Sequence, residues 1–423
     1  MRSPFRLLTA RMSSLQREIK NGWSHVSAAP ADPILGLTQL FLNDKNPSKV
    51  NLGVGAYRDE NGKPWVLPSV RMAEASRFNF NEQRVKDEVS YEYIPIEGIP
   101  GFVENAVKLA YSPDIAASKA IAAVQSVSGT GALRIAAEWL KRFYDRDIFI
   151  PAQSWANHNG IMTSANLNVK TYRYWDKTSL GLDFRSMLED IQNAEDGSII
   201  LLHACAHNPT GCDPTQDEWK EMEQVIRKKK QLVLFDMAYQ GFASGDTDED
   251  AWAVRYFINQ GHSIMLCQSF AKNMGLYGQR VGTFSFICSS EEEKRKCISQ
   301  VKRIIRSMYS SPPRFGAEIA KHIFENQAVR EQWLNDVKAM ANRVHAMRIQ
   351  LYNLLKEKHN IEWKHITLQK GMFAYTGLTE TQVKALADQH HIYMTSDGRA
   401  SIPGLNASNV EYVADCFAAV VKQ

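Results

Sequence analysis

The sequence is poor in the features that mark metal-binding, disulfide-rich and membrane-spanning proteins. Its six cysteines form neither a CxxC pair nor a histidine-spaced ligand set, so we expect no metal site and no disulfide framework. No stretch approaches the roughly 18 consecutive apolar residues that a membrane span needs. The formal net charge of +4 is small for 423 residues, and basic and acidic residues are interspersed. Nucleic-acid binding therefore has little support.

Acidic residues are also absent from the first 17 positions. The same stretch carries four arginines: Arg2, Arg6, Arg11 and Arg17. On a helix, one face would carry its apolar residues Met1, Phe5, Leu8 and Met12. An arginine-rich, acid-poor amphipathic start is typical of a mitochondrial transit peptide. We therefore expect import into the mitochondrial matrix. The alternative is a cytoplasmic protein with a plain N-terminal extension, or one translated from Met12.

The length favours two domains, because one hydrophobic core rarely serves so long a chain. Near-continuous apolar runs are typical of strands buried on both faces of a parallel sheet. They occur at 148–152, 198–206, 231–239, 263–272 and 283–288. Residues 217–230 have helical periodicity and lie between two such runs, which indicates a βαβ unit. We predict an α/β fold, with a mostly parallel central sheet flanked by helices.

Beyond about residue 338 the pattern changes to a long helix, short strands and a final helix. We interpret this part as a smaller α+β domain. The predicted division is an N-terminal extension and arm (1–28), a first part of the small domain (29–64), the large domain (65–338) and a second part of the small domain (339–423).

Several polar residues follow the apolar runs, at the strand ends where α/β proteins bind ligands. Lys272 stands between the apolar segments LCQSF and MGLY. Most lysines are solvated surface charges, but desolvation here would lower the pKa of the amine and make it a useful nucleophile. Ser269 and Arg280 lie nearby in the sequence. A hydroxyl donor and a planar, permanently charged fork both suit a phosphate group.

A second segment, VSGTGALR, has the character of an anion-binding turn. Ser128, Gly129 and Thr130 stand where a helix begins, so their N–H groups and the helix dipole favour a negative charge. The segment lacks the lysine of a nucleotide P-loop and does not match GxGxxG. Taken alone, the segment is weak evidence, and a plain capped helix start is the stronger interpretation. Together with Ser269 and Arg280 it predicts a phosphate pocket.

Asp236 ends the strongly apolar run LFDMAYQGF. It could cap a helix or form an ion pair between domains. Alternatively, its carboxylate could face a cofactor cation such as the ring nitrogen of pyridoxal phosphate, which must stay protonated to withdraw electrons. Tyr239 and Asn208 could then hold the phenolate oxygen of that cofactor.

These segments together resemble the fold-type-I aminotransferases of class I, and closely the aspartate aminotransferases of eukaryotic type. The motifs SFAKNMGLYGQRVG, HNPTG, SGTGALR, SWANHN and VNLGVGAYR carry the resemblance, which runs from about residue 29 to about 405. It implies pyridoxal phosphate as cofactor, bound by the large domain of a homodimer with shared active sites. The implied reaction is ping-pong transamination between L-aspartate and 2-oxoglutarate, giving oxaloacetate and L-glutamate.

The resemblance also implies roles for single residues. Lys272 would form the internal aldimine and shuttle the substrate proton. Asp236 would pair with the pyridine nitrogen, supported by His158 and more distantly by His203. Trp155 would stack on the cofactor ring. The remaining cofactor contacts would be Ser128, Gly129, Thr130, Asn208, Tyr239, Ser269, Arg280 and Tyr93, the last from the neighbouring subunit.

Two arginines would select dicarboxylic amino acids and oxoacids. Arg399 would bind the α-carboxylate, and Arg306 would reach the distal carboxylate from the other subunit. Loss of such a buried charge pair costs about 2–5 kcal/mol. Gly55 and Phe373 would lie on the small domain, which is expected to close over the substrate.

Three other functions stay open. Aromatic or broad-specificity aminotransferases keep both arginines, so Arg306 does not exclude them. A catalytically inactive relative could serve as a binding or scaffold protein. An NAD-dependent dehydrogenase lacks support because no glycine fingerprint is present. The sequence departs from the family at Gln153, where proline is usual and a cis peptide is thereby in doubt, and at Ser311, where asparagine is usual.

Overall fold

The computed structural model describes residues 23, 26–29, 33–77 and 91–422. The amphipathic segment expected at the N-terminus lies outside the described residues. None of the helices described is both long and apolar enough to cross a membrane.

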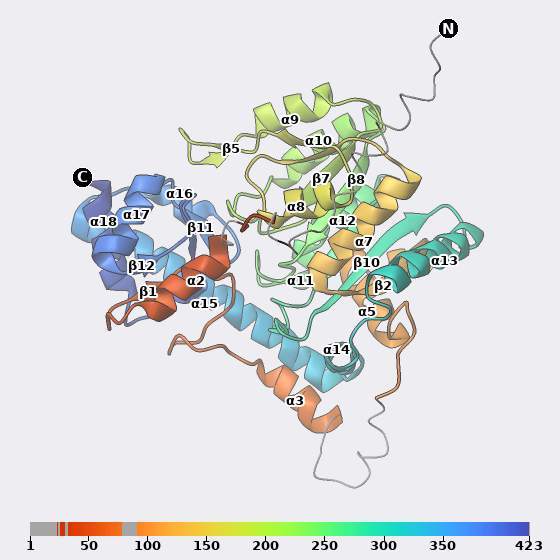
Figure 1. Cartoon of the computed structure of the whole chain (residues 1–423), viewed down its shortest axis with the longest axis horizontal. Helices are drawn as coiled ribbons and strands as arrows, with labels where there is room; N and C mark the ends of the chain where they lie inside the picture. The colour runs from red at the N-terminus through yellow and green to blue at the C-terminus, as the bar shows by residue number, and fades with distance from the viewer. Residues whose placement is uncertain (1–22, 24–25, 30–32, 78–90, 423) are drawn as a thin grey trace.

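A seven-stranded sheet forms the centre of the larger part of the molecule (Figure 1). Its order is β2 (Ala120–Val127), β10 (Val281–Cys288), β9 (Met265–Ser269), β8 (Leu232–Met237), β7 (Ile199–His203), β3 (Ile148–Pro151) and β4 (Val169–Tyr172). Strands β9, β8, β7, β3 and β4 are parallel neighbours, whereas β10 runs antiparallel to both β2 and β9. The predicted mostly parallel sheet is confirmed.

The near-continuous apolar runs arise because both faces of this sheet are covered. Successive side chains of β7 belong to different hydrophobic clusters: Ile200 to one and Leu201 to the other. The same alternation separates Phe235 from Leu234 in β8. Since neighbouring side chains of a strand point to opposite faces, each must be apolar when helices pack on both sides.

Helices cover the two faces of the sheet and fill the connections between strands. They are α3 (Pro68–Arg77), α5 (Pro100–Tyr111), α6 (Pro113–Ser118), α7 (Ser128–Phe143), α8 (Asn157–Ser164), α9 (Phe184–Asn193), α10 (Gln216–Lys228), α11 (Thr247–Asp250), α12 (Trp252–Asn259), α13 (Glu291–Met308) and α14 (Phe315–Glu325). A short antiparallel pair, β5 (Trp175–Asp176) and β6 (Gly181–Leu182), lies outside the main sheet. The predicted helix at 217–230 is α10, which begins in a capping box between Thr215 and Glu218.

The smaller part combines chain segments from both ends. Its elements are α2 (Pro33–Asn43), β1 (Val50–Asn51), α15 (Gln327–His359), α16 (Lys364–Leu368), β11 (Phe373–Tyr375), α17 (Glu380–His390), β12 (Ile392–Tyr393), β13 (Arg399–Ser401), a 3-10 turn (Ile402–Gly404) and α18 (Val410–Val421). Strand β1 pairs in parallel with β12, and β11 pairs antiparallel with β13.

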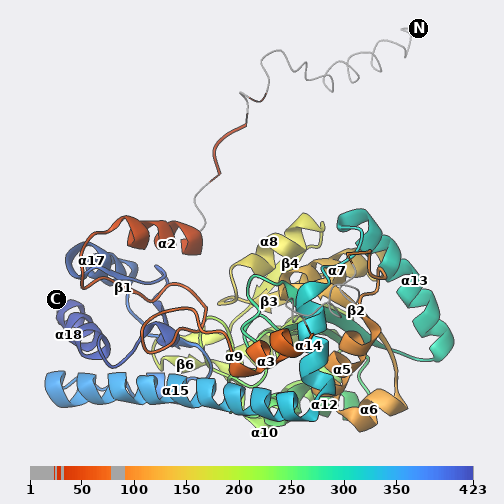
Figure 2. The same ribbon diagram turned by 90° about the horizontal axis from the view of Figure 1, so that it is seen from below.

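Helix α15 runs along both parts of the molecule (Figure 2). It packs against α3 and α14 at one end and against α16 and α18 at the other. It ends at His359, and the next residue, Asn360, caps it in a left-handed conformation (φ 56°), so that N–H groups at the cap donate to the last carbonyls of the helix. The division of the chain at about residue 338 stays a prediction, and that position falls within this helix.

Candidate active site

One pocket lies where β7, β8 and β9 end and α7 begins. Ser128, Gly129, Thr130, Leu133, Trp155, His203, Cys205, Asn208, Asp236, Ala238, Tyr239, Ser269, Lys272 and Arg280 line it. Most of the residues expected to hold a cofactor therefore meet in one place, although they come from segments as far apart as 128 and 280. Parallel strands bring them together, because their carboxyl ends meet at one edge of the sheet.

Lys272 follows β9 and reaches into this pocket. Its Nζ lies 5.8 Å from the ring centre of Tyr239 and 5.6 Å from that of Tyr277. Burial, followed by the positive charge of Arg280, lowers the pKa of this amine to about 8, although the carboxylate of Asp236 opposes the shift. Lys272 thus loses its proton far more readily than an exposed lysine, which favours its use as a nucleophile or general base.

Asp236 stands at one end of a chain of buried hydrogen bonds. His158 Nε2 lies 2.9 Å from Asp236 Oδ2, and Ser154 Oγ lies 2.8 Å from His158 Nδ1 and 3.0 Å from His203 Nε2. At the other end, the main-chain N–H of Asn208 donates to His203 Nδ1 at 3.4 Å.

This chain has a defined direction because a main-chain N–H can only donate. His203 Nδ1 accepts from Asn208, so a neutral His203 carries its proton on Nε2 and donates to Ser154. Ser154 then donates to His158 Nδ1, which leaves the Nε2–H of His158 to donate to Asp236. Burial holds the pKa of His203 well below its ordinary value, which keeps the ring neutral as this order requires.

The same chain keeps Asp236 ionised. Burial is the largest single effect and favours the protonated acid, but the hydrogen bond from His158 and nearby positive charge, including that of Lys272, together outweigh it and hold the pKa of Asp236 below its usual value. The pocket therefore contains a fixed negative charge. Ser154 had no assigned role in the sequence analysis. Its position four residues before His158, in the loop that precedes α8, was the available signal.

Helix α7 begins at the opposite wall and offers an oxyanion cradle. Ser128 Oγ lies 3.0 Å from Ser269 Oγ, and a side chain at Gly129 would come within 3.1 Å of Ser269 Cβ. Arg280 donates to the carbonyl of Tyr277 at 3.0 Å, and among the described residues no carboxylate forms an ion pair with it. Hydroxyls, the N–H groups of a helix start and an unpaired guanidinium together favour a phosphate.

Arg399 lies behind Asn208 and is only 5% exposed. Its Nη1 donates to Asn208 Oδ1 at 3.2 Å and its Nη2 to the carbonyl of Gly53 at 2.8 Å. Its Nε is buried with no hydrogen-bond partner. An unsatisfied buried donor is costly, so this guanidinium is suited to an incoming acceptor such as a carboxylate.

Aromatic rings confine this arginine and the pocket. The Phe373 ring centre lies 4.2 Å from the guanidinium carbon of Arg399. A Cβ added at Gly55 would lie 2.8 Å from the tip of the same ring, so glycine permits the contact. Asn208 Nδ2 donates to the hydroxyl of Tyr239 at 3.5 Å. Trp155 lines the pocket and meets His158 edge-on at 5.3 Å between ring centres.

Two expected site residues lie elsewhere on this chain. Arg306 is exposed in the last turn of α13, where it donates to Ser310. Tyr93 is 82% exposed. Neither lines the pocket. Both were assigned to the site of a neighbouring subunit, so their roles stay predictions.

The structure also bears on the backbone at Gln153 and on the expected absence of a metal site. Gln153, which stands where proline is usual, accepts a hydrogen bond from the N–H of Trp175 at 3.3 Å. Among the described residues, the cis peptide bond is Asn208–Pro209 rather than one at Gln153. The described part of the chain contains no group of three or more histidine, cysteine or acidic residues placed to hold a metal ion.

Comparisons with known proteins agree over nearly the whole chain. The family described as aminotransferase class I and II matches residues 47–417. Mitochondrial aspartate aminotransferase of Xenopus tropicalis is 49% identical over 416 residues, which are 97% of this chain and 96% of the relative.

Solved structures give the same result. Aspartate aminotransferase from Saccharomyces cerevisiae cytoplasm is 41% identical with a TM-score of 0.90, over 96% of this chain and 98% of that one. An aromatic-amino-acid aminotransferase from Burkholderia pseudomallei, covalently bound to pyridoxal phosphate, is 37% identical. Its TM-score is also 0.90, over 95% of this chain and 99% of that one.

Proposed function

This chain belongs to the aminotransferase class I and II family, and we propose that it transfers the amino group of L-aspartate to 2-oxoglutarate with pyridoxal phosphate as cofactor. The products are oxaloacetate and L-glutamate. The observation that carries the proposal is the meeting of a low-pKa lysine, a fixed carboxylate and an oxyanion cradle in one pocket, with a buried arginine beside it.

The residues of the pocket fit pyridoxal phosphate. The cradle of Ser128, Ser269 and Arg280 matches its phosphate, and Asp236 matches its basic ring nitrogen. Lys272 supplies the amine that would hold its aldehyde carbon. When bound, this cofactor supplies an electron sink for the charge left on the substrate when its α-proton is removed.

The chain's own residues handle the proton. Lys272 would accept the α-proton of the substrate at Nζ and would then release it toward the former aldehyde carbon of the cofactor. It would therefore act first as general base and then as general acid. Its low pKa matches this double use. Asp236 would keep its charge throughout, because His158 donates to it. Asn208 and Tyr239 would direct donors at the cofactor's phenolate oxygen.

Substrate selection is proposed to rest on two arginines. Arg399 would bind the α-carboxylate through its free Nε and the adjacent Nη2 edge. Arg306 would bind the distal carboxylate from a second copy of the chain, and Tyr93 would reach the phosphate from the same copy. This assignment requires a homodimer with shared sites.

A complementation experiment tests the shared site. Arg306→Ala and Lys272→Ala proteins are inactive or weak separately, but a mixed dimer contains one site with both native residues. After random exchange of subunits, about a quarter of wild-type activity is expected. Activity that stays at the sum of the separate variants refutes a shared site, and sedimentation of the wild-type protein as a monomer refutes the dimer.

We propose that the small domain, formed by residues 29–64 and 339–423, closes over the substrate that is bound to the large domain, residues 65–338. Gly55 and Phe373 lie on the first of these two groups of segments, where Gly55 contacts the Phe373 ring and that ring contacts Arg399. Movement of that group toward the pocket would exclude water from the bound substrate. A comparison of small-angle scattering with and without a dicarboxylate measures it, and identical profiles would count against closure.

The function is tested by an aspartate and 2-oxoglutarate assay beside borohydride reduction and peptide mapping. The expected label is on Lys272, and a label on another lysine overturns the assignment. A protein that shows no cofactor absorbance with added pyridoxal phosphate would instead be an inactive relative.

Aromatic amino acids are the second candidate substrates. The likeness to an aromatic-amino-acid aminotransferase at a TM-score of 0.90 favours them, since that protein shares the fold of the site. Turnover of aspartate is therefore to be compared with that of phenylalanine and tyrosine. A preference for the aromatic substrates would replace the dicarboxylate assignment.

A mitochondrial location is proposed from the acid-poor start of the chain and from the mitochondrial relatives. Fluorescently tagged proteins that start at Met1 and at Met12 separate the alternatives. We expect mitochondrial signal from the first and cytosolic signal from the second. Cytosolic signal from both removes the import hypothesis.

A further inference from the structure

Arg348 is a charged residue in the interior of α15, and it is 1% exposed. Its Nη1 donates to the carbonyl of Ile366 at 3.1 Å, and its Nη2 donates to those of Gly371 at 2.7 Å and Phe373 at 2.9 Å. Burial lowers its pKa to about 10, so it remains charged at physiological pH. A buried cation held by neutral carbonyl oxygens is costly, and its position needs a reason beyond filling space.

The three carbonyls that Arg348 holds belong to the segment 366–373. This segment contacts the loop that carries Asn208. A Cβ added at Gly371 would lie 2.5 Å from Cβ of Ala206. The N–H of Lys370 donates to the carbonyl of Gly211 at 2.7 Å. Lys370 and Gly371 thus touch this loop on both sides of Asn208. The side chain of Asn208 in turn accepts a hydrogen bond from Arg399.

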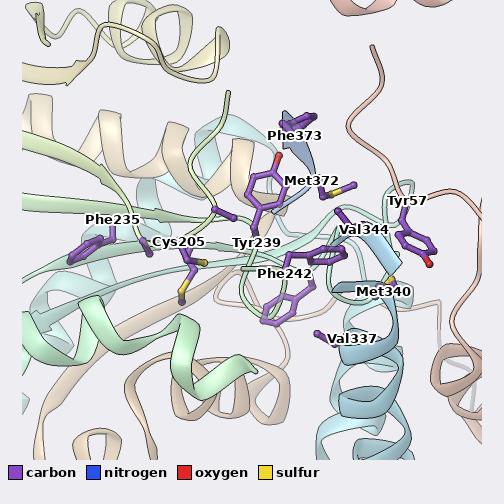
Figure 3. Close-up of a cluster of buried hydrophobic side chains, with 14 of the residues drawn as sticks. Tyr57, Cys205, Phe235, Tyr239, Phe242, Val337, Met340, Val344, Met372 and Phe373 are labelled. Carbon is purple, nitrogen blue, oxygen red and sulfur yellow. The ribbon is translucent and has the colours of Figure 1, made fainter. Parts of the chain in front are cut away.

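Phe373, the last residue of the segment, contacts Arg399 itself. Phe373 places its ring 4.2 Å from the guanidinium carbon of Arg399 and against Gly55. In the buried cluster of Figure 3, Phe373 lies beside Tyr239, and Val344 of α15 lies to the right of Tyr239. Arg348 is one helical turn beyond Val344, so α15 carries the guanidinium that fixes the segment.

We propose that Arg348 is a positioning residue for substrate binding, which holds Phe373 and the Asn208 loop at the distances that Arg399 needs to bind the α-carboxylate. The inference rests on the proposed function, in which Arg399 is the α-carboxylate ligand. A planar fork can hold several carbonyls at fixed angles, whereas a lysine ammonium cannot reproduce that geometry. A small misplacement of a binding group lowers affinity even when the group itself is intact.

Two variants of Arg348 and one control separate positioning from general stability. Arg348→Met removes all three hydrogen bonds, and Arg348→Lys keeps the charge with fewer of them. A cavity of about 210 Å³ is lined by both Arg348 and Gly371, so water can enter beside one of the freed carbonyls, and the lysine variant is expected to fold. Leu355→Ala, at a fully buried position on the same helix, lowers stability and leaves the three hydrogen bonds of Arg348 in place.

The measurements are the KM for L-aspartate, kcat, and the dissociation constant of succinate by calorimetry. Succinate is a dicarboxylate without an amino group, so it reports carboxylate binding apart from chemistry. For Arg348→Lys we expect both KM and the succinate constant to rise about tenfold, which equals about 1.4 kcal/mol. kcat should change less than either, and the cofactor spectrum should not change. Arg348→Met should show a larger rise.

The control decides the interpretation. Leu355→Ala should lower the melting temperature and leave KM and the succinate constant at wild-type values. Wild-type values in Arg348→Lys, or an equal rise in Leu355→Ala, overturn the proposal. A wild-type protein that binds succinate but does not transaminate aspartate would instead overturn the proposed function.

Discussion

Replacement of Lys272 by methionine should make the cofactor-free protein more stable near neutral pH. Methionine has a similar length and carries no charge, so the substitution removes the buried amine and little else. Lys272 has an ordinary pKa of 10.5, and burial together with the charge of Arg280 lowers it to about 8 in the folded protein. The folded state therefore binds this proton less tightly than the unfolded state does.

The size and pH range of the effect follow from that difference. Between pH 8 and 10.5 the unfolded chain holds more protons at this group, so stability rises with pH in this window. Below pH 8 the full penalty applies, and above 10.5 it is absent. The step from 10.5 to about 8 corresponds to about 3 kcal/mol at most.

The assay is urea unfolding of the cofactor-free protein at a fixed protein concentration, at pH 7 and at pH 10. Lys272→Met should be more stable than the wild type at pH 7, by up to about 3 kcal/mol, and the advantage should shrink at pH 10. Lys338→Met, an exposed position on α15, is the control and should show no such advantage. Equal stability at pH 7, or an advantage that does not depend on pH, would refute the reasoning.

Three further predictions concern the site. Arg399→Lys keeps the charge but loses the fork, so kcat/KM for aspartate should fall by roughly 30-fold, about 2 kcal/mol, and an unchanged value in steady-state kinetics would contradict its role. Ser154→Ala leaves two buried histidine nitrogens without a partner, so the free energy of unfolding should fall by about 1–3 kcal/mol in urea titration, and no loss would mean that water replaces the hydroxyl. Gly55→Ala brings a methyl group to 2.8 Å from the ring of Phe373, so the KM for aspartate should rise, and an unchanged KM would show that the ring yields freely.

Part of the fold and most of the pocket could be predicted from the sequence. The buried strands β7, β8 and β9 were predictable because a strand covered on both faces must be apolar at successive positions. Strand β2 was not predicted. Its sequence, AIAAVQSV, is rich in alanine, which has little intrinsic preference for strands, and pairing with β10 decides its conformation.

Residues that act through other residues were harder to find. Ser154 gains its importance from two histidines that approach it from α8 and from the end of β7. Arg348 looks like an ordinary helix residue until the chain from Ile366 to Phe373 folds back across it. Neither contact has a local sequence signature, because both join groups that are brought together only by packing.

The chemical groups of the site, and the order in which they follow the strands, can be read from the sequence alone. Lys272, Asp236 and the turn at Ser128 were recognisable because each follows or begins an element whose periodicity is local. How these groups act on one another depends on the folded arrangement of the chain. It lowers the pKa of Lys272 through burial and the charge of Arg280, and it fixes the direction of the hydrogen bonds that reach Asp236. Burial and long-range contact set both effects, and neither quantity is a property of a short stretch of chain.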